Sequence, residues 1–273
     1  MANAKYIRIE YRNVAKQFTS NNGADGAESI VRAVENVDLS IADGEVVSII
    51  GPSGCGKSTL LNMGAGLYLP SSGEVFLDQE KVDAPNPHVG FMLQKDLLLG
   101  WRTIRKNVEF GLEIQDIPSN ERQERSMDLL EKCRLTGFEN HYPHQLSGGM
   151  RQRAALARTL AVDPKVLLLD EPFSALDAQT KMILQQDLAQ TLSAENKTAL
   201  FITHDLVESV ALSDRVFVMS ARPGTIIEEI EVNLPDRANP MARRQDSQKQ
   251  IGDYVAQLMG LLHVGETATE IEI

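Results

Sequence analysis

The fold is decided by residues 46–59, which read Val46-Val47-Ser48-Ile49-Ile50-Gly51-Pro52-Ser53-Gly54-Cys55-Gly56-Lys57-Ser58-Thr59. A mostly apolar run is followed by glycine, four residues and Gly-Lys-Ser, which is the spacing of a phosphate-binding loop. The glycines let the backbone turn tightly enough for N–H groups at a helix N-terminus to surround phosphate oxygens. The order strand, loop, helix is the context that this motif requires, so we predict a nucleoside triphosphate site on an α/β sheet.

Each polar residue of the loop has an expected role in holding a triphosphate. Lys57 is predicted to reach the β- and γ-phosphates, and the Ser58 hydroxyl is predicted to bind a magnesium ion. Thr59 is expected to open the helix that follows. All residues from Gly51 to Thr59 are therefore predicted to contact the nucleotide.

An acidic pair follows a second apolar run, Val166-Leu167-Leu168-Leu169. Four apolar residues in a row are typical of a strand buried on both faces, which delivers Asp170 and Glu171 at its carboxyl end. We predict that Asp170 holds magnesium, directly or through water, and that Glu171 polarises or orients the attacking water. The alternative is that the two acids cap the turn before Pro172.

A third motif is Leu146-Ser147-Gly148-Gly149-Met150-Arg151-Gln152. Its pattern predicts that Ser147 caps a helix that has a glycine-rich start and one apolar face. Such a terminus is a second anion site, able to hold a γ-phosphate. One chain has no use for two such sites unless the second belongs to a neighbour's nucleotide.

Together these motifs resemble the nucleotide-binding subunit of an ATP-binding cassette (ABC) transporter, from about Tyr6 to Leu234. The resemblance implies an α/β P-loop NTPase core with a parallel sheet, an N-terminal antiparallel β subdomain and an inserted α-helical subdomain at about 95–160. Residues 6–234 would be the ABC ATPase domain, and residues 235–273 a C-terminal helical extension and tail. It also implies ATP and Mg²⁺ as cofactors, and two cassettes stacked head to tail so that two equivalent sites form.

The resemblance assigns roles to residues outside the loop. Gln94 would contact magnesium and the attacking water, and His204 would contact the γ-phosphate and position Glu171. Phe18 stands where the family stacks an aromatic ring on adenine, with Tyr11 as the rival ring or Phe18 as an ordinary core residue.

The residues expected to reach the partner's ATP are Ser147, Gly148, Gly149, Gln152 and Asp177. Asp177 has a second reading from its position alone. It could be the N-cap of a helix from Ala178 to Leu192.

Composition restricts the kind of partner. Of the 273 residues, 38 are acidic and 27 are Lys or Arg, a net charge of −11, which argues against binding nucleic acid or anionic lipid broadly. No stretch has the ~18 apolar residues that a membrane span needs, and Met1-Ala2-Asn3-Ala4-Lys5 does not begin like a signal peptide. Membrane attachment should therefore run through a protein.

The resemblance names these partners. They are transmembrane permease subunits, a second ABC subunit that we expect to be an identical copy, and indirectly a periplasmic or extracellular solute-binding protein. The expected location is peripheral, at the cytoplasmic face of the inner (plasma) membrane. Cys55 and Cys133 are the two cysteines, which suits a reducing cytoplasm, and alkylation of Cys55 is expected to block hydrolysis.

Several segments carry weaker expectations. Thr19 to Ser29 is expected to be a mobile surface loop. Ile251 to Leu262 is expected to be an amphipathic helix that packs on its own domain, with a dimer contact as the alternative. The stretch from Leu97 to Trp101 is either subdomain core or the floor of a groove for a permease helix. The segment Ser220-Ala221-Arg222-Pro223-Gly224, together with Val232-Asn233-Leu234-Pro235, resembles the nitrate, sulfonate and taurine importer branch, although a turn set by Pro223-Gly224 would also explain it.

The sequence therefore favours an ATPase subunit that energises an importer of a small anionic solute, such as a sulfonate or nitrate. Two alternatives stay open: a soluble ABC ATPase acting on a protein or nucleic-acid assembly, and an exporter subunit.

Overall fold

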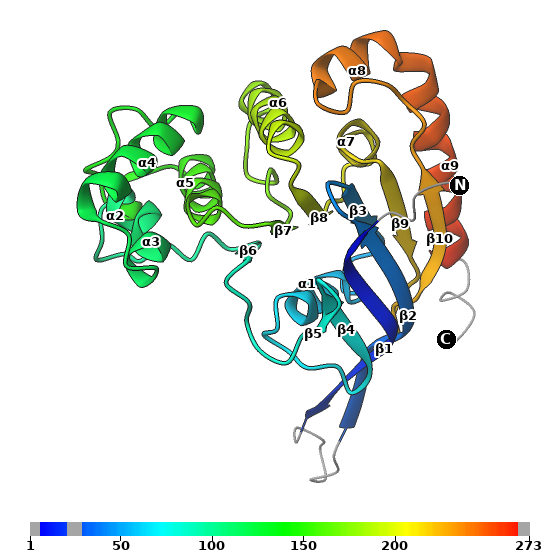
Figure 1. Cartoon of the computed structure of the whole chain (residues 1–273). Coiled ribbons are helices and arrows are strands. Elements are labelled where there is room, and N and C mark those ends of the chain that lie inside the picture. The colour runs from blue at the N-terminus through cyan, green and yellow to red at the C-terminus, as the bar shows by residue number, and fades with distance from the viewer. Residues whose placement is uncertain (1–5, 21–28, 267–273) are drawn as a thin grey trace.

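The computed structural model describes residues 6–20 and 29–266, and Figure 1 shows two sheets with helices around them. The smaller sheet is antiparallel, in the order β2-β1-β4-β5. Its strands are β1 (Ile7–Ser20), β2 (Ser29–Ala42), β4 (Ser72–Leu77) and β5 (Glu80–Lys81). In β1 and β2 apolar residues alternate with polar ones because one face of the sheet lies on the core.

The larger sheet has the order β10-β9-β3-β8-β7-β6, and all of its neighbours are parallel except β10 and β9. Its strands are β3 (Val46–Ile50), β6 (Val89–Met92), β7 (Val166–Asp170), β8 (Thr198–Ile202), β9 (Arg215–Met219) and β10 (Ile226–Glu231). Every residue of β3, β7 and β8 is buried, as the apolar runs at 46–50 and 166–169 predicted for β3 and β7. The parallel core therefore brings the ends of β3 and β7, which carry the glycine loop and the acid pair, to one edge of the sheet.

Helix α1 (Lys57–Gly64) lies between the two sheets (Figure 1). Its Leu60, Leu61 and Met63 join one hydrophobic cluster with residues of both sheets. On the other face of the larger sheet lie α6 (Ala178–Ala194) and α7 (Leu206–Leu212). The core is thus layered as sheet, helix, sheet, helices, which fixes the start of α1 beside the strand ends.

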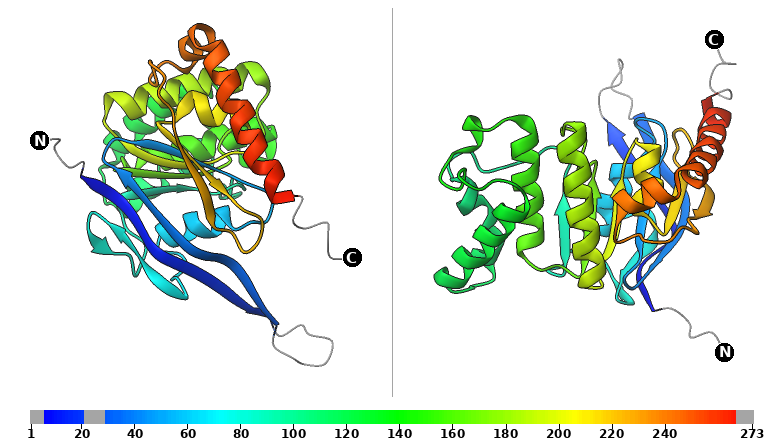
Figure 2. Two further views of the ribbon diagram at one scale, coloured as in Figure 1. Left: turned by 90° about the vertical axis from the view of Figure 1, so that its right-hand side faces the viewer. Right: turned by 90° about the horizontal axis from the view of Figure 1, so that it is seen from above.

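The residues between β6 and β7 form a helical insertion, set to one side of the sheets in Figures 1 and 2. It contains α2 (Ile104–Val108), α3 (Phe110–Ile114), α4 (Ser119–Lys132), the 3₁₀ helix η1 (Pro143–Gln145) and α5 (Gly148–Ala161). Helix α5 joins the two parts, because Ala154 and Ala157 pack in the insertion while Ala155 and Leu156 pack with the core strands.

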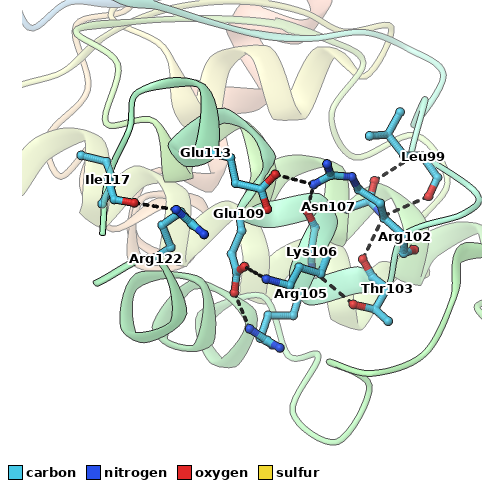
Figure 3. A network of polar contacts seen from close by, with 10 residues as sticks. All are labelled: Leu99, Arg102, Thr103, Arg105, Lys106, Asn107, Glu109, Glu113, Ile117 and Arg122. Atoms are coloured by element: carbon cyan, nitrogen blue, oxygen red, sulfur yellow. Dashed lines mark hydrogen bonds and ion pairs between the residues drawn. The ribbon is translucent and has the colours of Figure 1, made fainter. Parts of the chain in front are cut away.

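Polar contacts inside the insertion surround two buried side chains, Asn107 and Glu109 (Figure 3). Asn107 Nδ2 donates to the carbonyl oxygens of Leu99, Arg102 and Thr103, and Asn107 Oδ1 accepts the Leu99 N–H. These bonds tie the segment before α2 to the helix. That segment includes the Leu97–Trp101 stretch.

The C-terminal part forms α8 (Pro240–Asp246) and α9 (Gln248–Glu266). Ile251 and Leu258 of α9 pack with α7, β9 and β10, so this helix lies on its own chain, as expected. Arg243 of α8 is buried, and its guanidinium donates to the carbonyl oxygens of Val210, Ala211, Ser213, Val232 and Leu234. It thereby joins α8 to the end of α7 and to the chain after β10.

Some predicted boundaries were wrong by a few residues. Thr19 and Ser20 belong to β1 and Ser29 to β2, because the hairpin pairing continues that far, and residues 21–28 of the expected loop lie outside the described residues. Helix α1 begins at Lys57 and not at Thr59, and α6 continues to Ala194. In the described part of the chain, no helix combines the length and apolar character needed to cross a membrane.

Candidate functional site

The phosphate-binding loop connects the end of β3 with the first turn of α1. Two of its glycines have a left-handed backbone, Gly54 with φ of 75° and Gly56 with φ of 112°. A Cβ added at Gly56 would also lie 2.7 Å from the Ala33 carbonyl oxygen, so glycine alone fits. Lys57 Nζ donates to the carbonyl oxygens of Gly51 and Pro52, each at 2.8 Å. The lysine ammonium is therefore held over the loop, where a phosphate would meet it.

Cys55 was expected to react with alkylating reagents, but its side chain is buried. Its side chain is 1% exposed and belongs to the hydrophobic cluster between the sheets, because this position of the loop turns inward beneath the phosphate site. The thiol is therefore closed to reagents in the folded chain.

Asp170 is the last residue of β7 and is 4% exposed. Burial raises the pKa of its carboxyl, a hydrogen bond from Ser58 opposes this, and the neighbouring charge of Glu171 raises it further. Ser58 and Asp170, predicted magnesium ligands from separate parts of the sequence, thus lie near one another. Their hydroxyl and carboxylate oxygens are ligands of the kind that Mg²⁺ prefers.

Among the described residues no group of three or more His, Cys, Asp or Glu side chains could hold a metal ion. The predicted magnesium set of Ser58, Gln94 and Asp170 contains only one such residue. It suits an ion that takes its remaining oxygen ligands from phosphates and water.

Glu171 is the centre of a second group. Its backbone is left-handed, with φ of 49°, which costs a residue other than glycine about 1 kcal/mol or more. Gln94 Nε2 donates to Glu171 Oε2 at 3.2 Å, and His204 Nδ1 lies 3.5 Å from Glu171 Oε1. Gln94 follows β6, Glu171 follows β7 and His204 follows β8, so the sheet brings together the three predicted catalytic residues.

The signature segment begins α5 as predicted. Ser147 is the N-cap, and its hydroxyl accepts the Met150 N–H at 3.3 Å. Gly148 and Gly149 form the first turn, and a Cβ at Gly149 would lie 3.1 Å from the Ala175 carbonyl oxygen. The start of α5 therefore packs closely against the segment after Glu171.

Gln152, predicted to contact the partner's ATP, makes its contacts within its own chain, and contact with a partner's ATP stays a prediction. The side chain is 5% exposed, and its Nε2 donates to the Glu171 carbonyl at 2.9 Å while its Oε1 accepts the Ala175 N–H at 2.9 Å. Because Gln152 lies one turn of helix after the exposed cap, its side chain points into its own chain. Its amide connects α5 with the catalytic turn.

Asp177 is the N-cap of α6, and its Oδ1 accepts the Thr180 N–H at 3.0 Å. This backbone hydrogen bond, together with one from the Thr180 hydroxyl, lowers the pKa of the Asp177 carboxyl. The capping alternative is confirmed, and contact with a partner's ATP stays a prediction.

Of the two candidate aromatic rings, Phe18 is accessible and Tyr11 is not. Phe18 is 37% exposed, and its ring packs edge-on against Tyr68 with centroids 5.7 Å apart. Tyr11 is buried and its hydroxyl donates to the Leu60 carbonyl, so it has no free face for a base. The stacking role of Phe18 stays a prediction, with Tyr68 as a neighbour that the sequence did not indicate.

With this geometry known, comparison with characterised families gives an unambiguous match. Residues 34–174 fit the family model described as ABC transporter. The chain belongs to the ABC transporter family. Proteins of this family bind and hydrolyse ATP, and the chain is accordingly an ABC ATPase.

Three relatives show how far the similarity extends. An uncharacterized ABC transporter ATP-binding protein of Methanocaldococcus jannaschii, MJ0412, is 46% identical over 228 residues, covering 84% of this chain and 83% of that protein. The taurine import ATP-binding protein TauB of Yersinia pestis is 44% identical over 205 residues, 75% of this chain and 80% of TauB. The solved dimer of the ATP-binding cassette MJ0796, bound to ADP and Pi, has a TM-score of 0.75 at 34% identity, covering 82% of this chain and 99% of that one.

The sequence reasoning missed a polar cluster beside His204 in this ABC ATPase. Lys181 Nζ of α6 lies 2.8 Å from Asp205 Oδ2 and 2.7 Å from Glu208 Oε2, and Gln185 Nε2 donates to Glu208. Asp205 is also the N-cap of α7. The spacing of an aspartate and a glutamate three residues later, directly after His204, was the available signal. The cluster joins the helix capped by Asp177 to the turn that carries His204.

Proposed function

We propose that this ABC ATPase is the energising subunit of an importer for a small anionic solute, such as a sulfonate or nitrate. Two observations support import. The taurine import proteins of Yersinia are among its relatives, and the chain carries the Ser220–Gly224 segment that resembles the importer branch. The reaction itself rests on one arrangement, the Glu171 carboxylate held between Gln94 and His204 beside the phosphate-binding loop.

The chemistry follows from these positions. The N–H groups of the loop and the Lys57 ammonium would neutralise the β- and γ-phosphates. Glu171 would orient the attacking water and take its proton, while Gln94 and His204 restrict the carboxylate to one direction. Mg²⁺ bound by Ser58, Asp170 and Gln94 would neutralise further phosphate charge.

We propose that two identical copies form the hydrolytic unit, because the start of α5 offers a second phosphate site that its own loop does not need. Ser147, Gly148 and Gly149 of one copy would complete the ATP site of the other. The dimeric solved relative supports this arrangement.

Replacing Glu171 by Gln tests both ideas. Hydrolysis should fall by about 100-fold or more, since general-base catalysis contributes roughly that much. ATP should still bind and should hold the variant as a dimer, measured by light scattering after size exclusion. The matched control is Glu228→Gln, the same chemical change at an exposed position of β10. Wild-type hydrolysis by the Glu171→Gln protein, or a variant that stays monomeric in ATP, would contradict the scheme.

A permease docking site is supported by a cavity of about 470 Å³ between the insertion and the catalytic turn. It is lined by Gln94–Leu98, Gly148, Arg151, Gln152 and Ala175. Leu98 is partly buried and packs against the hydrophobic clusters of both the insertion and the larger sheet, whereas Leu97 is 54% and Trp101 77% exposed. The Leu97–Trp101 stretch therefore serves as core at one residue and offers apolar surface at others.

We propose that a cytoplasmic helix of the permease covers this surface, which places the ATPase peripherally at the inner face of the membrane. A solute-binding protein would act on the permease and not on this chain. Tagged chain should be captured from detergent-solubilised native membranes together with a multi-spanning protein identified by mass spectrometry. The Leu97→Glu variant should no longer capture the multi-spanning protein but should still bind ATP. Met259→Glu, at an exposed position of α9, should retain both capture and ATP binding.

Capture of soluble partners alone would favour the alternative of a soluble ABC ATPase. Direction is tested separately with the captured complex in vesicles. Radiolabelled taurine or another sulfonate should accumulate on the side that holds the ATPase, and ATP-driven loss from that side would favour an exporter.

A further inference from the structure

The turn between β9 and β10 lies directly on the phosphate-binding loop. It runs from Ser220 to Thr225, and the Ser220 N–H donates to the Thr225 carbonyl at 3.0 Å. Gly224 ties the turn to β2, because its N–H donates to the Ala33 carbonyl and its own carbonyl accepts the Glu35 N–H, each at 3.0 Å. A Cβ at Gly224 would overlap the Cys55 carbonyl oxygen, so the backbones of turn and loop are in contact.

Arg222, at the tip of this turn, reaches the loop with its side chain. Its Nε and Nη2 donate to the Gly54 carbonyl oxygen at 3.1 and 3.0 Å. Gly54 has a left-handed backbone, so its carbonyl points in a different direction from the carbonyls of a helix or a strand. The planar guanidinium offers two donors in one fixed geometry and can therefore hold both the position and the direction of the carbonyl.

Within the described residues the guanidinium of Arg222 bonds to this carbonyl and forms no salt bridge with an acid. A cation held one peptide from a site for a polyanion lowers the free energy of the bound state. Because these hydrogen bonds fix the Gly54 carbonyl, they also fix the peptide between Gly54 and Cys55 and so restrict the conformations that the loop can adopt.

We propose that Arg222 is a positioning residue of the ATP site, which holds the phosphate-binding loop in its binding conformation and adds positive charge beside it. This gives the Arg222-Pro223-Gly224 segment a role in nucleotide affinity, independent of the transported solute. Gly224 acts with Arg222, since it allows the turn to approach the loop.

The test compares wild type, Arg222→Ala, Arg222→Lys and Gly224→Ala in the full chain. Kd for ATP is measured by competition with a fluorescent ATP analogue, KM and kcat by phosphate release, and Tm by calorimetry. Arg222→Ala should raise Kd and KM about fivefold with kcat changed less than about twofold, as for an exposed charged hydrogen bond. Arg222→Lys should recover part of the affinity, and Gly224→Ala should weaken binding in the same direction.

The matched control is Arg12→Ala, an exposed arginine paired with Glu10 in the antiparallel sheet. It should leave Kd, KM and kcat unchanged. Because salt screens the charge of Arg222, the ratio of ATP affinities between wild type and Arg222→Ala should shrink at high salt. Wild-type Kd and KM in Arg222→Ala overturn the proposal, as does a loss that appears only in kcat or only in Tm. Should the alanine variant fail to fold, the comparison of Arg222→Lys with Arg222→Gln decides on the same measurements.

Discussion

Replacing Asn107 by aspartate should destabilise the helical insertion strongly, although the two side chains have the same shape. Asn107 is 0% exposed, and its Nδ2 donates to the carbonyls of Leu99 and Arg102 at 3.1 Å and of Thr103 at 3.0 Å (Figure 3). Aspartate keeps an acceptor for the Leu99 N–H but places an oxygen opposite these three carbonyls. The change removes donors without creating a cavity.

The size of the effect follows from these contacts. The two hydrogens of the lost amide donor are worth about 1 kcal/mol each, and burying an unpaired carboxylate among carbonyl oxygens adds a comparable or larger cost. We expect a loss of about 3–5 kcal/mol at pH 8. For a chain of this length each kcal/mol corresponds to about 2–4 °C in Tm.

The assay is urea unfolding followed by circular dichroism, with quenching of Trp101 fluorescence as a local probe. Trp101, the one tryptophan of the sequence, lies within the segment that Asn107 holds. Burial should raise the pKa of the new carboxyl in the folded state above its unfolded value. The variant should therefore recover stability relative to wild type as pH falls through that raised pKa, because the protonated acid can donate again.

Asn239→Asp is the matched control. Asn239 caps α8 as an acceptor only, with its Oδ1 accepting the Ala242 N–H, so aspartate should serve equally well. The reasoning is refuted if Asn107→Asp lies within about 1 kcal/mol of wild type at pH 8, or if its deficit does not change with pH.

Three further predictions concern groups whose environment the structure defines. Glu109→Gln should cost about 1–3 kcal/mol at neutral pH: burial opposes ionisation of Glu109, but hydrogen bonds from Lys106 and Arg105 lower its pKa below the ordinary 4.5. Because the folded pKa is the lower one, this stability is present above pH 4.5 and is lost as pH falls further, so urea midpoints of variant and wild type should converge in acid. Arg243→Met should cost about 3–5 kcal/mol in the same assay by leaving buried carbonyls without donors, and an unchanged midpoint would contradict this role. Cys55 should resist alkylation in the folded chain and react in urea, counted by mass spectrometry, whereas rapid native labelling would show that the loop opens.

The sequence predicted the nucleotide site well because its motifs follow strands of one parallel sheet. Once β3, β7 and β8 are recognised as buried strands, their carboxyl ends must meet at one edge, which brings Lys57, Asp170 and His204 together. Side-chain direction was harder. Gln152 was expected to reach a partner, yet one helical turn beyond Ser147 it faces inward, and Cys55 was expected to be reactive although the loop buries it.

Interactions between distant segments could not be predicted from local patterns. The contact of Arg222 with Gly54 joins residues 168 positions apart, and it depends on the register of β9 beside β3. Strand β9 itself was not predicted, so the possible turn at Pro223-Gly224 could not be placed beside the phosphate-binding loop. The Lys181 cluster likewise needs α6 and α7 to be packed side by side before its charges can be seen to meet.

The hydrogen bonds of the Gln152 amide have a consequence for the timing of ATP hydrolysis at the two sites. In a head-to-tail pair, the cap at Ser147 would sense one nucleotide while Glu171 of the same chain would cleave the other. The side-chain amide of Gln152 connects the cap with the catalytic turn, since Gln152 lies one turn from the cap and its Nε2 donates to the carbonyl of Glu171. Release of phosphate from the first nucleotide would then disturb the geometry of the second reaction, so the two hydrolysis events would not proceed independently.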